Sequence, residues 1–295
     1  MPTLLRPAHV GRLLADFIAA PVGMRSANHL SLIGALHSGN IAPRAGLVPG
    51  TATLNEWIFE GSDGPWSAPL WMLDPVTGIA LLEICGPLVK GYDDFTAWFY
   101  ECASIDRISR ALDEIASAPG VRALVICIDS PGGVCIGMPE LSAKIAALAT
   151  RLLVVTHTSD CAASNGMRLA VAGSLFFPTA SAQVGCIGVY IALYDYCAML
   201  EQMGVKLELY RAGKYKGLDV MGHARTPEES TFLQDNVDRC NADFQTFVRS
   251  RRPGVADSSM QGQWFDGAQA VELGLADDVV TGLPEVLAKV AASLA

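Results

Sequence analysis

From about Gly78 onward, continuous apolar runs alternate with segments in which apolar residues recur at helical spacing. Residues 79–89, 121–130 and 151–157 (IALLEICGPLV, VRALVICIDS and RLLVVTH) each predict a strand; the run at 121–130 is of the kind found in strands covered on both faces, and the run at 151–157 predicts another buried strand. Between these runs, apolar positions predict a helix over Ser104–Ala118 and a second helix over Pro139–Ala149. Strands that alternate with helices in this way predict an α/β fold with a parallel central sheet and flanking helices.

The C-terminal half continues this pattern with further strands and one long helix. Residues 183–193 (QVGCIGVYIAL) and 206–213 (KLELYRAG) are predicted to add strands. Thr226, Pro227 and Glu229 form a typical helix start, with an N-cap threonine, proline at the first position and glutamate at the third. Apolar residues then recur on one helical face as far as Val248.

The first 76 residues differ in composition, with Pro, Gly, Ser and Asn at short intervals. We interpret residues 1–76 as an N-terminal arm or extension that is partly irregular, and residues 77–295 as the main domain. The apolar patch at 17–22 is similar to part of a signal peptide, but Arg12 and Asp16 interrupt it. An amphipathic first helix fits this segment better.

Composition limits the classes of partner. Hydrophobic residues make up 51% of the chain and charged residues 17%, while no apolar run approaches the roughly 18 residues that span a bilayer. Apolar surface in excess of one core favours burial between subunits, so we expect a homo-oligomer and no membrane segment. The net charge of −9 disfavours binding to nucleic acid.

Eight cysteines occur without any CxxC spacing, and several lie inside apolar runs. This pattern is typical of reduced, buried thiols in a cytoplasmic protein and predicts neither a disulfide framework nor a metal site. No motif indicates another cofactor.

Three short motifs carry candidate chemistry, although each is common on its own. Asp129–Gly133 (DSPGG) follows a buried strand, and its glycines allow backbone N–H groups to face a bound oxygen. Ser164 follows another strand and opens a short helix, where an N-cap serine would also be ordinary. Lys214 and Lys216 lie in GKYKG, and two solvated loop lysines would explain that segment equally well.

In their order and contexts, these motifs resemble the signal peptide peptidase A family and its relatives, the capsid-maturation proteases of tailed phages. The matching segments are IDSPGG (128–133), AASNG (162–166), GCIGV (185–189) and GKYK (213–216). The resemblance implies a crotonase/Clp-like fold, a Ser-Lys peptidase, and an assembly into a ring or dome. It also implies that Ser164 is the nucleophile, that Lys216 at the last position of GxxK is the general base, and that Gly132 and Gly133 bind the oxyanion.

Two residues depart from the family pattern. Asn165 stands where the family has a glycine after the serine; its backbone N–H can still contact an oxyanion, but its side chain makes the pocket smaller. Cys186 replaces a serine that in the family supports the lysine, and a thiol is a weaker hydrogen-bonding partner.

Other bases were weighed against Lys216. Lys214 lies two residues away and could share a face with it. His157 precedes Ser164 by seven residues, whereas the histidine of Clp proteases follows its serine, and His223 lies beyond the lysines. Neither histidine is assigned a catalytic role.

The resulting hypothesis is a serine endopeptidase of the phage type that processes a scaffold or portal protein in the host cytoplasm or procapsid. Two alternatives remain at this stage. One is an enoyl-CoA hydratase/isomerase, which would need carboxylates at the reacting carbon, and near Ser164 the sequence offers Asp160. The other is a catalytically degenerate capsid-assembly component, which the departures at Asn165 and Cys186 would allow.

Overall fold

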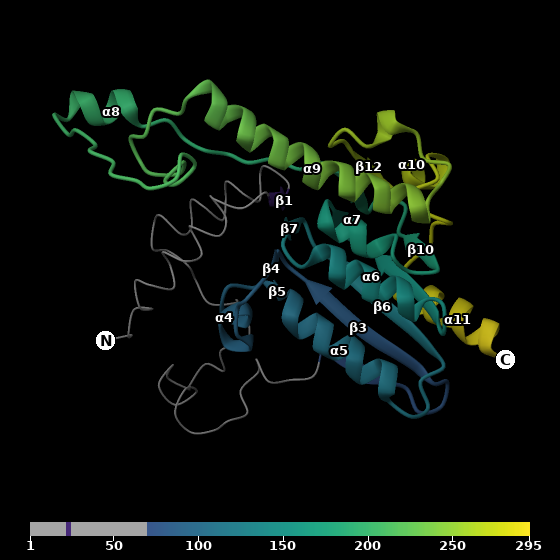
Figure 1. Cartoon of the computed structure of the whole chain (residues 1–295). Helices are drawn as coiled ribbons and strands as arrows, with labels where there is room; N and C mark the ends of the chain where they lie inside the picture. Colours follow the sequence, from purple (N-terminus) through teal and green to yellow (C-terminus); the bar gives the residue numbers. More distant parts are fainter. Residues whose placement is uncertain (1–21, 25–69) are drawn as a thin grey trace, which may run out of the picture.

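A computed structural model describes residues 22–24 and 70–295 of the chain, and its centre is a five-stranded sheet (Figure 1). The strands lie in the order β10-β8-β6-β3-β2, and all neighbours are parallel except β2 and β3. Their bounds are Trp71–Leu73 (β2), Ile79–Cys85 (β3), Ala123–Asp129 (β6), Leu153–Thr158 (β8) and Leu175–Pro178 (β10). The predicted α/β fold with a parallel central sheet and flanking helices is confirmed.

Helices cover both faces of this sheet, which explains the continuous apolar runs. On β6, Leu124, Ile126 and Ile128 belong to the core beneath α5 (Ile105–Ser117), α6 (Met138–Leu148) and α7 (Asn165–Ala170). The alternate residues Ala123 and Val125 pack on the opposite side, with α11 (Leu283–Leu294). Because successive side chains of a strand point to opposite faces, a strand between two helical layers must be apolar at nearly every position.

Two small sheets lie beyond the carboxyl ends of the central strands. One has the order β1-β7-β4-β5 and contains Val22–Met24 (β1), Gly132–Val134 (β7), Leu88–Val89 (β4) and Ala103–Ser104 (β5). The other has the order β12-β11-β9 and contains Trp264–Asp266 (β12), Gln183–Gly185 (β11) and Cys161–Ala163 (β9). Since β7 follows β6 and β9 follows β8, the loops after two central strands meet at one edge of the domain.

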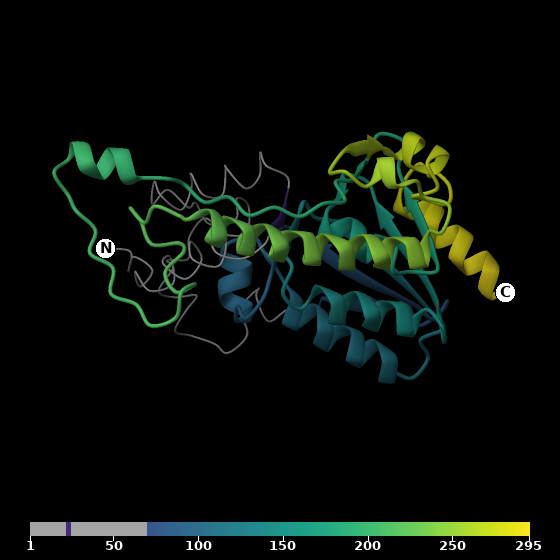
Figure 2. The ribbon, with the colours of Figure 1, turned by 45° about the horizontal axis from the view of Figure 1, so that its top comes forward.

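The chain segment that connects β11 to the long helix α9 (Pro227–Arg251) projects from this body. The short helix α8 (Cys197–Gln202) lies near the far end of this projection (Figures 1 and 2). The predicted helix start is confirmed, because Thr226 and Glu229 form a reciprocal capping box. Two further short helices complete the described elements, α4 (Asp94–Phe99) and α10 (Gly267–Glu272), together with a 3₁₀ turn at Asp257–Ser259.

The strand predicted over residues 206–213 is wrong, because this part of the projection has no regular secondary structure. The strand predicted over 183–193 is likewise reduced to Gln183–Gly185. The projection carries exposed apolar side chains, among them Met203, Val205 and Tyr210, the last of which is 88% exposed. A strand pattern needs a neighbouring strand to complete its hydrogen bonds, and the described part of this chain offers none to residues 206–213.

None of the described helices is long and apolar enough to cross a membrane.

The C-terminal part of the domain is fixed by one carboxylate. Asp277 accepts two hydrogen bonds from the Arg252 guanidinium, at 2.7 and 2.6 Å, and one from the Phe176 backbone N–H at 2.6 Å. Burial raises the pKa of Asp277, but the Arg252 and Phe176 hydrogen bonds outweigh it and hold that pKa below its usual value. The ionised carboxylate therefore ties the end of α9 to the edge strand β10.

We expect Asp277→Asn to lower the free energy of unfolding at pH 7 by about 1–3 kcal/mol, because the charge-assisted bonds from Arg252 are weakened. The folded-state pKa of Asp277 is depressed, so its contribution is present above the ordinary aspartate value of 3.8 and is lost as pH falls below it. Chemical denaturation of both proteins from pH 7 to pH 3 should show the difference shrinking. Asp278→Asn is the control: its carboxylate is exposed and lies 3.7 Å from Lys289, so it should change stability by less than about 0.5 kcal/mol.

Candidate active site

Ser164 lies at a sharp turn between β9 and α7, with φ 52° and ψ −121°. Few residues other than glycine adopt a positive φ, and such strain persists only where the surroundings enforce it. Here the Ser164 N–H donates to the Gly185 carbonyl at 2.8 Å, and the Ser164 carbonyl accepts from the Arg168 N–H at 3.0 Å. The Ser164 side chain is 1% exposed, and its Oγ has no hydrogen-bond partner among the described residues.

The Asp129–Gly133 turn lies directly beside this serine. Backbone bonds join Ser130 to β9: the Ser130 N–H donates to the Cys161 carbonyl at 2.7 Å, and the Ala163 N–H donates to the Ser130 carbonyl at 3.0 Å. A Cβ atom at Gly166 would lie 2.7 Å from the Ser130 carbonyl oxygen, so the first turn of α7 can approach this closely only with glycine there. The structure therefore brings the two predicted motifs together.

The two predicted oxyanion glycines form the start of β7 but differ in their contacts. The Gly132 N–H donates to the Ser130 Oγ in a long bond of 3.2 Å. Gly133 packs so closely on β4 that a Cβ atom there would lie 2.0 Å from the Leu88 carbonyl oxygen. A side chain at Gly133 would push β7 away from β4 and displace the turn.

Asn165 holds the same strand through its side chain. It is 3% exposed, and its Nδ2 donates to the carbonyls of Gly133 at 3.2 Å and Val134 at 2.9 Å. In the sequence, Asn165 was a departure that reduced the pocket. In the structure, its amide also links the residue after Ser164 to the glycine strand.

Cys186 follows the residue whose carbonyl receives the Ser164 N–H, and it is itself held at φ 54°. The backbone therefore has a constrained conformation at two places, at Ser164 and at Cys186 on the neighbouring chain segment. Cys186 is half-buried, and its predicted support of the lysine stays a prediction.

Lys216 does not reach Ser164 within one chain. It is exposed on the projection, whereas Ser164 is buried with its Oγ unpartnered among the described residues. Lys214 is also exposed and forms an ion pair with Glu228, and this hydrogen bond is the main cause that raises the pKa of Lys214. A lysine that an ion pair holds in its charged form is a poor general base, which argues against Lys214 in that role.

A buried carboxylate anchors the backbone around Lys216 to the start of α9. The Arg211 guanidinium donates to the Lys216 carbonyl at 3.2 Å and to Glu229 Oε1 at 2.7 Å. Glu229 Oε2 also accepts from the Thr226 N–H at 2.8 Å and lies 3.0 Å from His223 Nε2. We refer to Arg211, His223, Thr226 and Glu229 as the Glu229 cluster.

Hydrogen bonds within the Glu229 cluster strongly favour the ionised form of the Glu229 carboxylate. The Thr226 backbone N–H is the largest cause, and with Arg211 and His223 it lowers the pKa of Glu229 to about 2. The Glu229 carboxylate therefore stays ionised throughout the ordinary pH range.

His157 belongs to the core and not to the site. Its Nδ1 lies 2.6 Å from the Phe177 carbonyl and its Nε2 lies 2.9 Å from Ser159 Oγ, while burial lowers its pKa. His223 is used by the Glu229 cluster. Neither histidine forms a hydrogen bond with the Ser164 side chain.

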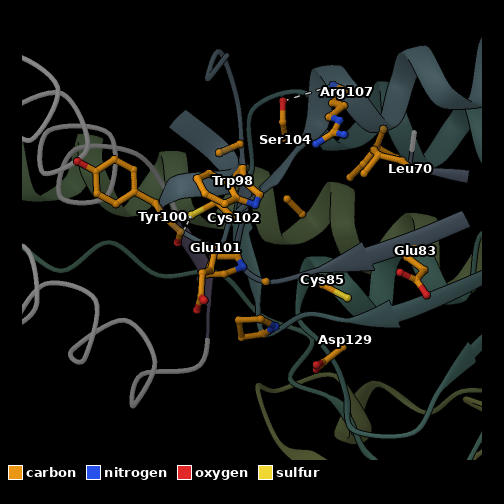
Figure 3. A pocket seen from close by; sticks show the side chains of 16 residues that line it. Leu70, Glu83, Cys85, Trp98, Tyr100, Glu101, Cys102, Ser104, Arg107 and Asp129 are labelled. Carbon is orange, nitrogen blue, oxygen red and sulfur yellow. Dashed lines mark hydrogen bonds between the residues drawn. The ribbon is translucent and has the colours of Figure 1, made fainter. Parts of the chain in front are cut away.

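Two cavities lie near the Asp129–Gly133 turn and Asn165. The larger, of about 570 Å³, lies between the ends of β3 and β6 and the region of α4 and α5; Asp129 and Cys85 line one side and Trp98, Ser104 and Arg107 the other (Figure 3). Ser164 does not line it. The smaller cavity, of about 170 Å³, is lined by Asn165 with Met138, Val189 and Phe244, and Ser164 does not line it either.

The family model that describes peptidase family S49 matches residues 146–294, which is half of the chain and includes both Ser164 and Lys216. The chain belongs to peptidase family S49. This confirms the resemblance to the signal peptide peptidase A family that the motifs indicated.

Viral proteins are among the relatives of this S49 chain. It is 28% identical to the capsid assembly protease C of Escherichia phage lambda over 95% of the chain and 61% of that protein. It is 29% identical to the head-tail preconnector protein GP5 of Enterobacteria phage P21 over 70% of the chain and 41% of that protein. The chain thus spans about three fifths or less of the length of these relatives.

Solved structures match this S49 chain only distantly. They include an enoyl-CoA hydratase/isomerase from Marinobacter aquaeolei, with a TM-score of 0.44, 12% identity and coverage of 76% of this chain and 75% of that one. A membrane-bound stomatin-specific protease in complex with a substrate peptide matches with a TM-score of 0.38 and 16% identity, covering 69% and 78%. The crotonase/Clp-like assignment therefore rests on the sheet order described above and on family membership.

The anchoring of Lys216 in this S49 chain could not be recognised from its sequence. Glu229 was identified as a capping residue, but its second role depends on Arg211, which lies 18 residues earlier in an apparently strand-like run. Arginine and glutamate on a polar surface are too common for their pairing to be predicted across such a distance.

We expect Glu229→Gln to loosen residues 211–226, because glutamine preserves a helix-capping group but cannot balance the Arg211 charge. Hydrogen exchange followed by mass spectrometry should show faster exchange in this segment at pH 7. The pKa of Glu229 is depressed in the folded state, so the carboxylate stabilises the segment above the ordinary value of 4.5, and this contribution is lost as pH falls toward about 2. Glu228→Gln, which removes an exposed carboxylate paired with Lys214, should leave the exchange of Arg211 and Thr226 unchanged. Equal effects of the two variants would show that Glu229 has no special role.

Proposed function

We propose that this S49 chain is a serine endopeptidase in which Ser164 is the nucleophile and Lys216 is the general base. The observation that carries the proposal is the strained turn at Ser164, which presents a buried, unpartnered hydroxyl beside the Asp129–Gly133 turn. A hydroxyl of this kind normally finds a hydrogen-bond partner, so its isolation is consistent with a partner that arrives with the substrate or with another subunit. Strained strand-to-helix turns of this type expose nucleophilic serines in other hydrolases.

The proposed reaction is acyl transfer through a covalent intermediate. Neutral Lys216 Nζ takes the proton from Ser164 Oγ as this oxygen attacks a peptide carbonyl, and the resulting ammonium protonates the leaving amine. Water, activated by the same amine, then hydrolyses the acyl-enzyme. Backbone N–H groups drawn from Gly132, Gly133 and Asn165 would stabilise the oxyanion, and one such donor is typically worth about 3 kcal/mol. The long bond from the Gly132 N–H to Ser130 Oγ would have to yield if Gly132 is one of these donors.

In our proposal the dyad is completed between protomers of a homo-oligomer. Lys216 lies on a projection with exposed apolar side chains, and residues 206–213 have a strand-like sequence without a partner strand among the described residues. Packing this projection against a second copy would cover the apolar surface and could supply the missing strand. It would also remove the lysine from water, which favours the neutral amine that the mechanism needs.

The viral relatives support a role in capsid assembly, with a polypeptide of the scaffold or portal as the substrate, in the host cytoplasm or the procapsid. Their names, capsid assembly protease and head-tail preconnector protein, place those two proteins at this stage of virus assembly. This assignment of substrate is separate from the assignment of Ser164 and Lys216, and each can fail without the other.

We expect Ser164→Ala and Lys216→Ala each to lower the rate of peptide hydrolysis by about 10³-fold or more, because nucleophile and base act as a unit. Hydrolysis of an unfolded protein and labelling of Ser164 by a fluorophosphonate, both read by intact mass spectrometry, measure this directly. Lys214→Ala is the matched control and should retain most of the activity, since its ammonium is paired with Glu228.

Mixing the two inactive variants tests where the dyad forms. If Ser164 of one protomer works with Lys216 of its neighbour, randomly mixed oligomers should regain about a quarter of wild-type activity, because that share of the sites receives both intact residues. Recovery must depend on subunit exchange, which dissociation and reassembly would provide. Two inactive variants that never complement each other would exclude a shared site, and a fully active Ser164→Ala protein would remove the peptidase assignment altogether.

A further inference from the structure

A segment of the N-terminal region occupies the edge of the glycine strand. Val22–Met24 form β1, which pairs antiparallel with β7 in the register Val22 with Val134, Gly23 with Gly133, and Met24 with Gly132. In the sheet order β1-β7-β4-β5, β1 is the outer strand (Figure 1). Without it, this edge of β7 would be open among the described strands.

The edge of β7 is suited to recognising a peptide backbone. Its other edge is filled by β4, on which Gly133 packs too closely to allow a side chain. Asn165 fixes the carbonyls of Gly133 and Val134 relative to Ser164. An exposed strand edge of this kind binds extended peptides by strand addition, in which main-chain hydrogen bonds supply the affinity.

The direction of β1 places its carboxyl end at the proposed nucleophile. Because the pairing is antiparallel, Met24 lies opposite Gly132, at the turn that adjoins Ser164, and Val22 lies farther along β7. A peptide that approaches Ser164 along β7 in this direction brings successive carbonyls toward the glycine turn. An extended peptide that paired with β7 and ran toward Ser164 in this direction would take the same position and polarity as β1.

We propose that Val22–Met24 is an internal occupant of the substrate-binding edge of β7 and competes with substrate peptides for it. This inference rests on the proposed function, since it takes Ser164 and the Asp129–Gly133 turn as the site of cleavage. The chain must withdraw β1 before an extended substrate can pair with β7. The segment thus inhibits the peptidase until a substrate binds the edge of β7 tightly enough to displace it.

The size of this restraint follows from the covalent tether. Because β1 is covalently tethered, it acts at an effective concentration set by the tether and not by the protein concentration, so even weak pairing can fill the site. If β1 occupies the edge about nine tenths of the time, the apparent Kd of a peptide is about tenfold above its intrinsic value. Releasing β1 should then tighten peptide binding by that factor without changing the chemistry at Ser164.

The test uses the full chain with Ser164→Ala, so that binding is measured without cleavage, and a fluorescent peptide with the sequence of residues 19–28 as the probe. Gly23→Pro and Met24→Pro are both made, because neighbouring N–H groups of a strand point to opposite edges and one of the two therefore faces β7; the proline at that position removes a pairing N–H, whereas Gly23→Ala keeps the N–H and is the matched control. Fluorescence anisotropy should show the Kd falling about tenfold in at least one proline variant and little change in Gly23→Ala. With Ser164 intact, the KM for the unfolded protein substrate should fall by the same factor while kcat stays constant.

A second measurement leaves β1 unaltered, so that misfolding of a variant cannot decide the outcome. In the Ser164→Ala chain, saturating peptide should displace β1 and accelerate hydrogen exchange at residues 22–24, while Gly132–Val134 remain protected by the bound peptide. Peptide binding that leaves the exchange of residues 22–24 unchanged would overturn the proposal, as would an unaltered Kd in both folded proline variants. If no protein with intact Ser164 cleaves any peptide, the peptidase proposal fails, while the binding and exchange results still decide whether β1 is a competing strand.

Discussion

The structure of the site depends on one strained residue, Ser164, held at φ 52° where β9 ends and α7 begins. A non-glycine residue in such a conformation costs on the order of 1–3 kcal/mol, so the surrounding contacts must enforce it. They do so from two sides: Gly185 accepts the Ser164 N–H, and Ser130 pairs with β9 through two backbone hydrogen bonds. The same bonds bring the Asp129–Gly133 turn beside the serine, so the strain and the proximity of the two motifs have one origin.

Much of the fold could be predicted because its signals are local. The apolar runs of β6 and β8 report that both faces are buried, and the Thr226–Glu229 capping box marks the start of α9 to the residue. The prediction failed at residues 206–213, where apolar residues suggested a strand. A strand needs a partner strand, and the described part of the chain contains none for this segment. The apolar residues of 206–213 therefore indicate an exposed apolar surface and not a strand of the central sheet.

The candidate site divides in the same way. The proximity of Ser164 to Gly132 and Gly133 could be predicted, because the carboxyl ends of neighbouring parallel strands meet at one edge of a sheet. The amide contacts of Asn165 and the bridge from Arg211 to Glu229 could not, because both depend on side chains that are distant in sequence and ordinary in type. The position of Lys216 relative to Ser164 could not be predicted from the sequence either. The motifs identify both residues, but they do not show that Ser164 is buried in the body while Lys216 is exposed on a projection.

This division has a physical consequence for how the site can be controlled. The serine half is rigid, since its backbone is fixed by buried hydrogen bonds and α7 is buried along its whole length. The backbone at Lys216, the proposed base, is held by the Glu229 cluster on an exposed projection, through hydrogen bonds from Arg211 to the Lys216 carbonyl and to Glu229. Because β1 pairs with β7 and Lys216 is exposed on the projection, the two proposals together imply that an isolated chain has neither an open substrate edge nor a buried amine. Under the proposed mechanism, assembly would supply the second of these and substrate binding the first, so that hydrolysis would require both events together.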